Sequence, residues 1–343
     1  MPNLQPLRIL GFCLLAMGCS DESPWSVDPD GVSMPAVAPP AALHQVVATL
    51  PADDSEALLL FREAAGPFAA AYTEDILGLG PADAPATAAE LRRFAAHESI
   101  APSLAAIDST SGAPGRLADA ERELDRAFRR FHHHFPDAPV PRLYWIHSGF
   151  NYAVYPTDSA LAIGLEWFMG PDHPIVESLA PSIFAAYMKA RMHPDMMAAD
   201  ALRGWLLVHF SDPWYAPEQC ADAVLFWGKV LFILNELLPE TPDADWMDWT
   251  AESWAWAEAH EREIWLELSR QDQIYNAHPL EFIRWFNEGP FTRAGNLPQD
   301  SPDRLGAWMG YRIVSAYMAD HPEVSLAELM EMTDPLPFLK AYR

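Results

Sequence analysis

The sequence predicts a mainly α-helical domain of the α+β class with one small antiparallel sheet. Apolar residues recur at helical spacing over most of the chain, whereas one stretch near residues 142–165 contains short β-rich runs separated by turn residues. Half of the 343 residues are hydrophobic, including 13 Trp and 17 Phe, which is enough for a large core. Residues 43–343 are therefore expected to form a single domain, preceded by a signal peptide over 1–18 and a tether over 19–42.

The first 18 residues have the features of a secretory signal peptide. Arg8 precedes an apolar run over 9–17 that is too short to span a bilayer, and the small residue Gly18 ends it. Cys19 follows directly, as in the lipobox of bacterial lipoproteins, whose cysteine is acylated with chains such as palmitate. We expect a lipid anchor at Cys19 in the cell envelope. Ser20, rather than aspartate, favours the outer membrane over the inner membrane.

Residues 19–42 are rich in Pro, Ser, Asp and Ala and show no periodicity typical of a folded element. Pro35, Pro39 and Pro40 favour extended, solvated chain. We therefore expect a disordered tether that lifts the domain off the lipid surface.

The net charge limits the partners that the protein could bind, and the number of cysteines limits the disulfide bonds that it could form. The formal net charge of −26 argues against binding nucleic acid through charge. Cys13 leaves with the signal peptide and Cys19 is acylated, so Cys220 remains alone and no intramolecular disulfide is expected. The domain must then be stable through packing alone.

Three helices are expected before the sheet, over Ser55–Tyr72, Thr87–Ala96 and Leu117–Phe131. The spacing of apolar residues then changes from the helical period to that of strands. Three short runs rich in aromatic and β-branched residues predict a three-stranded antiparallel meander: Arg142–His147, Asn151–Tyr155 and Leu161–Leu165.

Helical spacing returns after the predicted meander. Thr250 is a suitable N-cap for one helix, and Gly306 and Gly310 on another would allow close approach of a neighbouring element. Val224–Leu238 is apolar on nearly every face and is predicted to be a buried central helix. The expected helices are Ile175–Met192, Pro194–Phe210, Pro217–Leu238, Thr250–Ser269, Pro279–Asn287, Pro302–Asp320 and Ser325–Met332.

Known catalytic motifs are missing from the sequence. It contains no His-Glu-x-x-His helix, no Gly-x-Ser-x-Gly elbow and no phosphate-binding loop. Asp172-His173 could bind a metal or cap the following helix. Lys229, in an apolar helix, must pair, reach solvent or shift its pKa, and we interpret it as a structural lysine. We therefore predict no metal and no cofactor.

Short segments spread in order over residues 43–343 resemble the gliding-motility lipoprotein B family. They include Ser148-Gly149-Phe150-Asn151-Tyr152, Glu263-Ile264-Trp265 and Ser301-Pro-Asp-Arg-Leu-Gly306. Asp303 departs from the family pattern, in which a glycine is common at this position. The resemblance implies a lipid-anchored envelope protein with envelope partners, accompanying motility and secretion machinery, and supplies no biochemical activity.

The same domain is distantly similar to a family of putative zinc peptidases, which implies a degenerate zincin-like fold. The stretch Trp205–His209 would correspond to the metal-binding helix, and Trp227-Gly228 to the third ligand. Only His209 could then be a ligand, and one histidine cannot hold catalytic zinc.

We therefore expect a pseudo-metallopeptidase: a non-enzymatic component of an envelope assembly. A zincin-related hydrolase with an unrecognised active site is one alternative. A lipoprotein that binds a peptide or glycan in the vestigial cleft is the other. The candidate cleft or structural polar residues are Asp172, His173, His209, Lys229, Glu263 and Arg304.

Overall fold

The computed structural model describes residues 23–35, 37–110, 116–211 and 217–342. About 58% of the chain is helical, so the prediction of a mainly α, α+β domain is confirmed. The strands are β1 (Ala41–Ala42), β2 (Arg142–Ile146), β3 (Val154–Pro156) and β4 (Ala160–Gly164). The helices are α1 (Leu43–Ala48), α2 (Asp54–Ala65), α3 (Thr87–Ala95), α4 (Ala101–Thr110), α5 (Arg116–His134), α6 (Pro174–Ser178), α7 (Ala186–Ala190), α8 (Met197–His209), α9 (Cys220–Leu237), α10 (Ala251–Ala259), α11 (Glu261–Leu268), α12 (Gln271–Ile274), α13 (Pro279–Phe282), α14 (Leu305–Asp320), α15 (Leu326–Glu331) and α16 (Leu336–Ala341).

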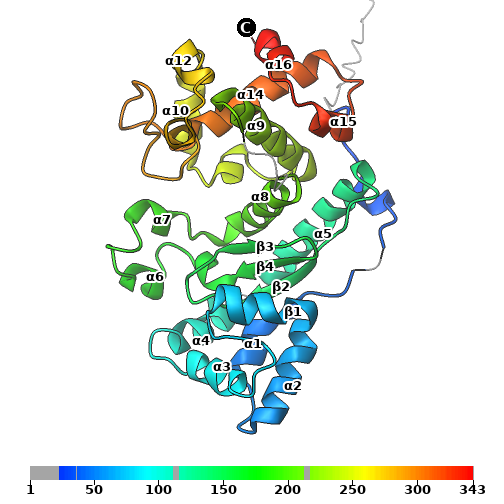
Figure 1. Ribbon diagram of the computed structural model, residues 1–343, viewed down its shortest axis with the longest axis vertical. Helices are drawn as coiled ribbons and strands as arrows, with labels where there is room; N and C mark the ends of the chain where they lie inside the picture. The colour runs from blue at the N-terminus through cyan, green and yellow to red at the C-terminus, as the bar shows by residue number, and fades with distance from the viewer. Residues whose placement is uncertain (1–22, 36, 111–115, 212–216, 343) are drawn as a thin grey trace, which may run out of the picture.

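The sheet is mixed, with strand order β1-β2-β4-β3 (Figure 1). β2 pairs in parallel with both β1 and β4, and only β3 and β4 are antiparallel. The three runs that we expected to be strands are strands, but the predicted three-stranded antiparallel meander is wrong. β4 lies between β2 and β3, and a two-residue strand from the predicted tether adds to the edge.

The loop between β2 and β3 explains this order, because it crosses past the end of β4 instead of forming a tight turn. Oε1 of the buried Glu166 accepts hydrogen bonds from the backbone N–H groups of Ser148 and Phe150, at 2.8 and 3.0 Å. A Cβ at Gly164 would lie only 2.3 Å from the carbonyl oxygen of Tyr152. Glycine at the end of β4 therefore lets the loop pass over it.

Both faces of the sheet are buried, against different helices. On one face, Tyr144 of β2 and Ala162 of β4 pack with side chains of α1 and α2, and Phe68 stacks on Tyr144 with ring centroids 4.6 Å apart. On the other face, Trp145 and Ile163 pack with α5, α8 and α9. Figure 1 shows α1–α4 on one side of the sheet and the remaining helical layer on the other.

Helices α9 and α14 cross closely at two glycines. A Cβ on Gly228 would lie 2.3 Å from the carbonyl oxygen of Gly310, and a Cβ on Gly310 would lie 2.2 Å from the carbonyl oxygen of Val224. Glycine at both positions is therefore needed for the backbones to touch, which confirms the expected close approach at Gly310. α9 is buried along most of its length, as predicted for the central helix. In the described part of the chain, none of the helices combines the length and apolar character needed to cross a membrane.

Three of the expected long helices are interrupted. The predicted helix Ser55–Tyr72 stops being regular at Gly66, where α2 ends with φ 54°. The predicted helix Ile175–Met192 is two short ones, α6 and α7, separated by a segment that contains Pro181. The predicted helix Thr250–Ser269 breaks at His260 into α10 and α11, and the hydroxyl of Thr250 caps α10 by accepting the N–H of Ser253 at 3.2 Å, as expected for an N-cap.

Residues 23–35, which we call the N-terminal strap, lie against the domain and are not a free tether. The indole N–H of Trp25 donates to the carbonyl of Val324 at 2.7 Å, and its ring meets Phe232 of α9 edge-on at 5.3 Å. The hydroxyl of Ser23 donates to Glu236 at 2.7 Å, and His134 contacts the carbonyl of Trp25 at 3.0 Å. Part of the segment that we expected to be a disordered tether therefore contacts the domain, because the aromatic residue Trp25 within it has partners in the core. The predicted signal peptide, Cys13 and Cys19 lie outside the described residues.

Candidate functional site

A cleft opens where the β2–β3 loop, α7, α8, α9 and the start of α14 come together. Its volume is about 360 Å³. The walls include the aromatic rings of Tyr152, Trp167 and Trp227, and the polar groups include Arg191 and Glu288. This combination of aromatic surface and convergent polar groups is typical of a ligand site.

Four charged residues that are buried or nearly buried line the cleft: Asp200, Arg203, Asp248 and Arg304. Together with the buried Asp303, which pairs with Arg304, they form what we call the charged cluster. Nη2 of Arg203 lies 2.7 Å from Asp248 Oδ2 and also donates to Asp200 one turn earlier on α8. Arg304 contacts Asp248 at 3.2 Å and Asp303 at 3.3 Å, and it donates to the carbonyl of Met247. The cluster thus joins α8, the segment before α10 and the start of α14.

Asp303 connects this cluster to the opening of the cleft. Its Oδ2 accepts from Arg191 Nη2 at 2.7 Å and from the backbone N–H of Gly289 at 2.8 Å, and its Oδ1 accepts from the indole N–H of Trp249 at 2.9 Å. The aspartate that departs from the family pattern in the sequence is therefore an acceptor shared by three separate segments.

Two residues of the cluster have backbone conformations that are uncommon for side-chain-bearing residues. Asp248 has φ 51° and Arg304 has φ 54°, both in the left-handed region, and Phe150 beside the cleft has φ 59°. Such conformations cost about 1 kcal/mol or more each and persist where the surroundings fix them. Here Asp248 and Arg304 form an ion pair with each other at 3.2 Å.

The pKa values of the carboxyl groups in the cluster are shifted in different directions. Burial raises the pKa of Asp200, and the neighbouring charge of Asp248 raises it further, to well above the usual range. Burial also acts to raise the pKa of Asp248, but Arg203, a hydrogen bond to Asp200 and Arg304 outweigh it and hold the pKa low. Asp303 likewise has a lowered pKa, because Arg304 and Arg191 outweigh its burial. Asp200 thus differs from Asp248 and Asp303 in the direction of its pKa shift.

A second buried group, Ser103, His147 and Glu166, has the residue types of a hydrolytic triad. The positions of its protons differ from those in a hydrolytic triad. The N–H of Gly149 donates to His147 Nδ1 at 3.0 Å, so the ring proton is on Nε2 and is donated to Ser103 Oγ at 2.7 Å. A histidine in this tautomer cannot accept the serine proton, and its pKa is lowered by burial. The group ties α4 to the β2–β3 loop.

Of the candidate residues from the sequence, only Arg304 lies in this cleft. Lys229 donates to the carbonyls of Met330 and Met332, at 3.1 and 2.9 Å, and burial lowers its pKa to about 8. Glu263 is exposed on α11. Lys229 therefore connects α9 to the segment after α15, in keeping with a structural lysine.

The other candidates lie apart from the charged cluster. Asp172 is exposed, and His173 caps α6 by accepting the N–H of Ile175 at 3.2 Å, which is the capping alternative. His209 stacks on Trp205 with ring centroids 4.7 Å apart, and it is absent from the described residues that line the cleft. The ring of Trp227 stacks on that of Phe286, so Trp227 and His209 have different ring partners.

The described residues contain no group of three or more His, Cys, Asp or Glu side chains that could hold a metal ion. The charged cluster itself, with guanidinium groups between its carboxylates, is a poor cation site. Sequence reasoning missed Asp200, Arg203 and Asp248. A signal was present in the pair Asp200 and Arg203, which are polar residues one turn apart within the otherwise apolar stretch of α8.

Comparison with known proteins identifies a family. The model of the family described as gliding motility protein GldB matches residues 29–343, from the N-terminal strap to the last residue. No curated protein and no solved structure gives a match. The comparisons do not show the zincin-like similarity, which stays a prediction from the sequence.

Proposed function

The chain belongs to the gliding motility protein GldB family, and from this membership we propose a lipid-anchored, non-enzymatic component of gliding-motility or secretion machinery. The anchor is the acylated Cys19, and the location is the cell envelope, with the outer membrane favoured. The partners are other envelope proteins. The function is that of a scaffold, which presents the cleft and its surroundings to those partners.

The observation that supports a scaffold is the pairing of charges in the cleft. Asp248 and Asp303 each contact two guanidinium groups, at 2.7 and 3.2 Å for Asp248 and at 2.7 and 3.3 Å for Asp303. Such pairing holds a carboxylate ionised and fixed, which suits a rigid binding surface better than a group that must exchange protons. The charged cluster therefore stabilises the shape of the cleft.

Asp200 gives a specific reason to keep the zincin-related hydrolase as a second candidate. Its pKa is raised while that of Asp248 is lowered, and two carboxyl groups with separated pKa values can act as acid and base. Hydrolysis of a labelled casein or peptide by the purified protein, lost in Asp200→Asn, would favour the enzyme. Stoichiometric zinc in the purified protein would do so as well.

The anchor is tested by Cys19→Ser, with Cys220→Ala as the control because Cys220 is buried in the core. Metabolic labelling with palmitate and membrane fractionation should show that Cys19→Ser loses the lipid and the membrane attachment while Cys220→Ala keeps both. Unchanged lipidation in Cys19→Ser would refute the anchor.

The machinery role is tested by cross-linking in cells. A photoreactive residue in place of Tyr152, which lines the cleft and is 40% exposed, should capture envelope proteins. The same residue in place of the exposed Leu59 on α2, on the far side of the sheet, is the control. Recovery of the same products at both positions, or of no envelope protein at Tyr152, would contradict a partner at the cleft.

A further inference from the structure

We propose that the groove beside the cleft binds an extended peptide segment of a partner, one that carries both apolar side chains and carboxylates. This deepens the proposed function, on which it rests for the statement that the partner is an envelope protein. The binding itself does not depend on the lipid anchor.

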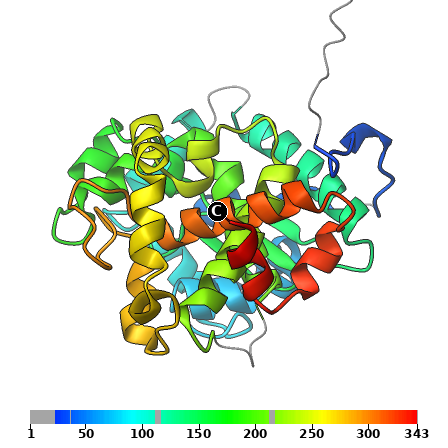
Figure 2. The same ribbon diagram turned by 90° about the horizontal axis from the view of Figure 1, so that it is seen from above.

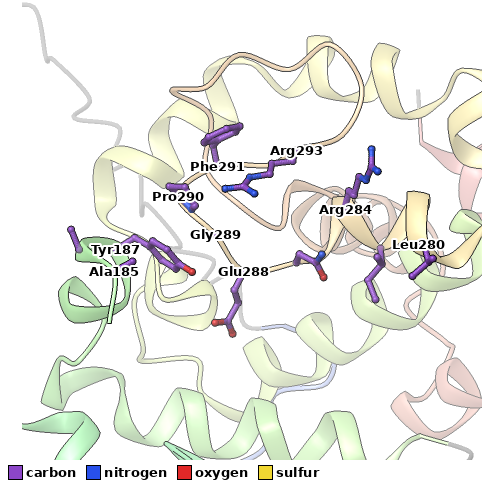
Figure 3. A pocket seen from close by; sticks show the side chains of 12 residues that line it. Ala185, Tyr187, Leu280, Arg284, Glu288, Gly289, Pro290, Phe291 and Arg293 are labelled. Atoms are coloured by element: carbon purple, nitrogen blue, oxygen red, sulfur yellow. The ribbon is translucent and has the colours of Figure 1, made fainter. Parts of the chain in front are cut away.

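The groove lies between α7 and the segment that runs from α13 to residue 293, and its volume is about 1150 Å³. Figure 3 shows its lining: Tyr187 and Pro290 near one end, Phe291 above them, and Leu280 with Arg284 at the other end. Leu280 is 85% exposed and Ile283 is 44% exposed. Exposed aliphatic side chains gathered along a groove are typical of a surface that a partner covers.

The groove continues into the cleft. Glu288 lines both, and Tyr187 of α7 lines the groove while Arg191, the residue that follows α7, lines the cleft. The two spaces therefore adjoin at Glu288. The volume of the groove alone exceeds that of a typical small-molecule pocket, which is about 300–1,000 Å³, and suits a segment of chain.

The charge of the groove is opposite to that of the protein. Its lining contains two arginines, Arg284 and Arg293, and one carboxylate, Glu288, in a chain whose net charge is −26. Within the described residues, neither arginine has a carboxylate at ion-pair distance, and Arg293 lies over the ring of Phe291 at 5.5 Å. The side chain of Glu288 extends away from Phe291 and Arg293 in Figure 3. Two unpaired guanidinium groups in an acidic protein would attract carboxylates.

The exposed apolar side chains and the arginines together determine which kind of peptide the groove would bind. Apolar side chains of the partner would cover Leu280 and Ile283, and its carboxylates would pair with Arg284 and Arg293. A nucleic acid also carries negative charge, but its charged backbone offers no aliphatic side chains to cover Leu280 and Ile283.

The test uses fluorescence anisotropy with the lipidated full-length protein in detergent. The probes are two short fluorescein-labelled peptides, one of alternating leucine and aspartate and one of alternating leucine and lysine. We expect the acidic peptide to bind at least about tenfold more tightly, and the double variant Arg284→Glu/Arg293→Glu to reverse the preference. Leu280→Asp should weaken the acidic peptide by a similar factor without loss of folding, because this side chain is exposed.

The matched control is Arg122→Glu/Arg126→Glu on α5, which changes the charge equally at exposed positions. It should leave the affinity for the acidic peptide unchanged. Equal affinity for both peptides, equal loss in the control, or binding of chitohexaose but neither peptide would overturn the proposal. Cross-linking of an envelope partner at Tyr152 together with no peptide binding would refute only this inference and leave the machinery role standing.

Discussion

Arg304 provides the sharpest test of the charged cluster, because it joins three segments. It contacts Asp248 at 3.2 Å and Asp303 at 3.3 Å, and it donates to the carbonyl of Met247. Arg304→Met keeps most of the side-chain volume and removes all three interactions. The side chain is almost completely buried, so water cannot replace them without opening the structure.

The expected loss of stability depends on the interactions that remain after Arg304 is replaced. Removing one member of a buried ion pair costs about 3–5 kcal/mol. Asp248 keeps Arg203 and Asp303 keeps Arg191, so no carboxylate is left alone. The loss should therefore lie near the lower limit. An unpaired carbonyl at Met247 adds to it, since a buried acceptor without a donor costs about 1–3 kcal/mol. We expect the free energy of unfolding to fall by about 4–6 kcal/mol.

The assay is urea unfolding followed by tryptophan fluorescence, with the slope and the midpoint fitted separately. Arg312→Met is the control on the same helix, because Arg312 is 37% exposed and pairs with Glu261 at 3.0 Å. An exposed pair of this kind contributes less than about 1 kcal/mol. If Arg304→Met lost no more stability than Arg312→Met, the cluster would not hold the cleft together.

Three further predictions concern other parts of the fold. Gly310→Ala should lower the free energy of unfolding by at least about 1–3 kcal/mol, because the added Cβ meets the Val224 carbonyl at 2.2 Å, and an unchanged melting temperature would refute this contact. Burial lowers the pKa of His134 to about 4, so its contribution to stability is present above pH 6.5 and is lost as the pH falls toward 4. His134→Gln should flatten the unfolding free energy over this range, and an unaltered pH profile would contradict the assignment. Trp25→Ala should expose the N-terminal strap to limited proteolysis within residues 23–35, whereas equal protection in both proteins would show that Trp25 does not hold it.

The positions of helices and strands were predicted from the sequence more accurately than their arrangement in space. Helical periodicity located the buried α9 and the close contact at Gly310, because both depend on local spacing and residue size. Strand pairing does not depend on local spacing alone. The runs that form β2, β3 and β4 are short and apolar, and the choice between an antiparallel meander and the observed order depends on Glu166, which holds the β2–β3 loop open from a later part of the chain.

The cleft was harder to predict than the fold. Arg304 was found because it lies in a segment that resembles the family. Asp248 could not be singled out among 48 acidic residues, since its special role comes from burial and from sharing Arg203 with Asp200. The groove arginines carried no sequence signal either, because what distinguishes them is the lack of a nearby carboxylate in the folded chain.

The N-terminal strap has a mechanical consequence. Cys19 and Ser23 are four residues apart, which corresponds to at most about 14 Å of extended chain. With lipid on Cys19, as proposed, the domain could move only a short distance away from the membrane surface. The strap lies beside α15, whereas α7, which lines the groove, lies on the other side of the molecule in both Figure 1 and Figure 2. A pull exerted by a partner in the groove would pass through the core to Phe232 and Trp25, and from there to the bilayer. The protein would therefore transmit force as a short, stiff link.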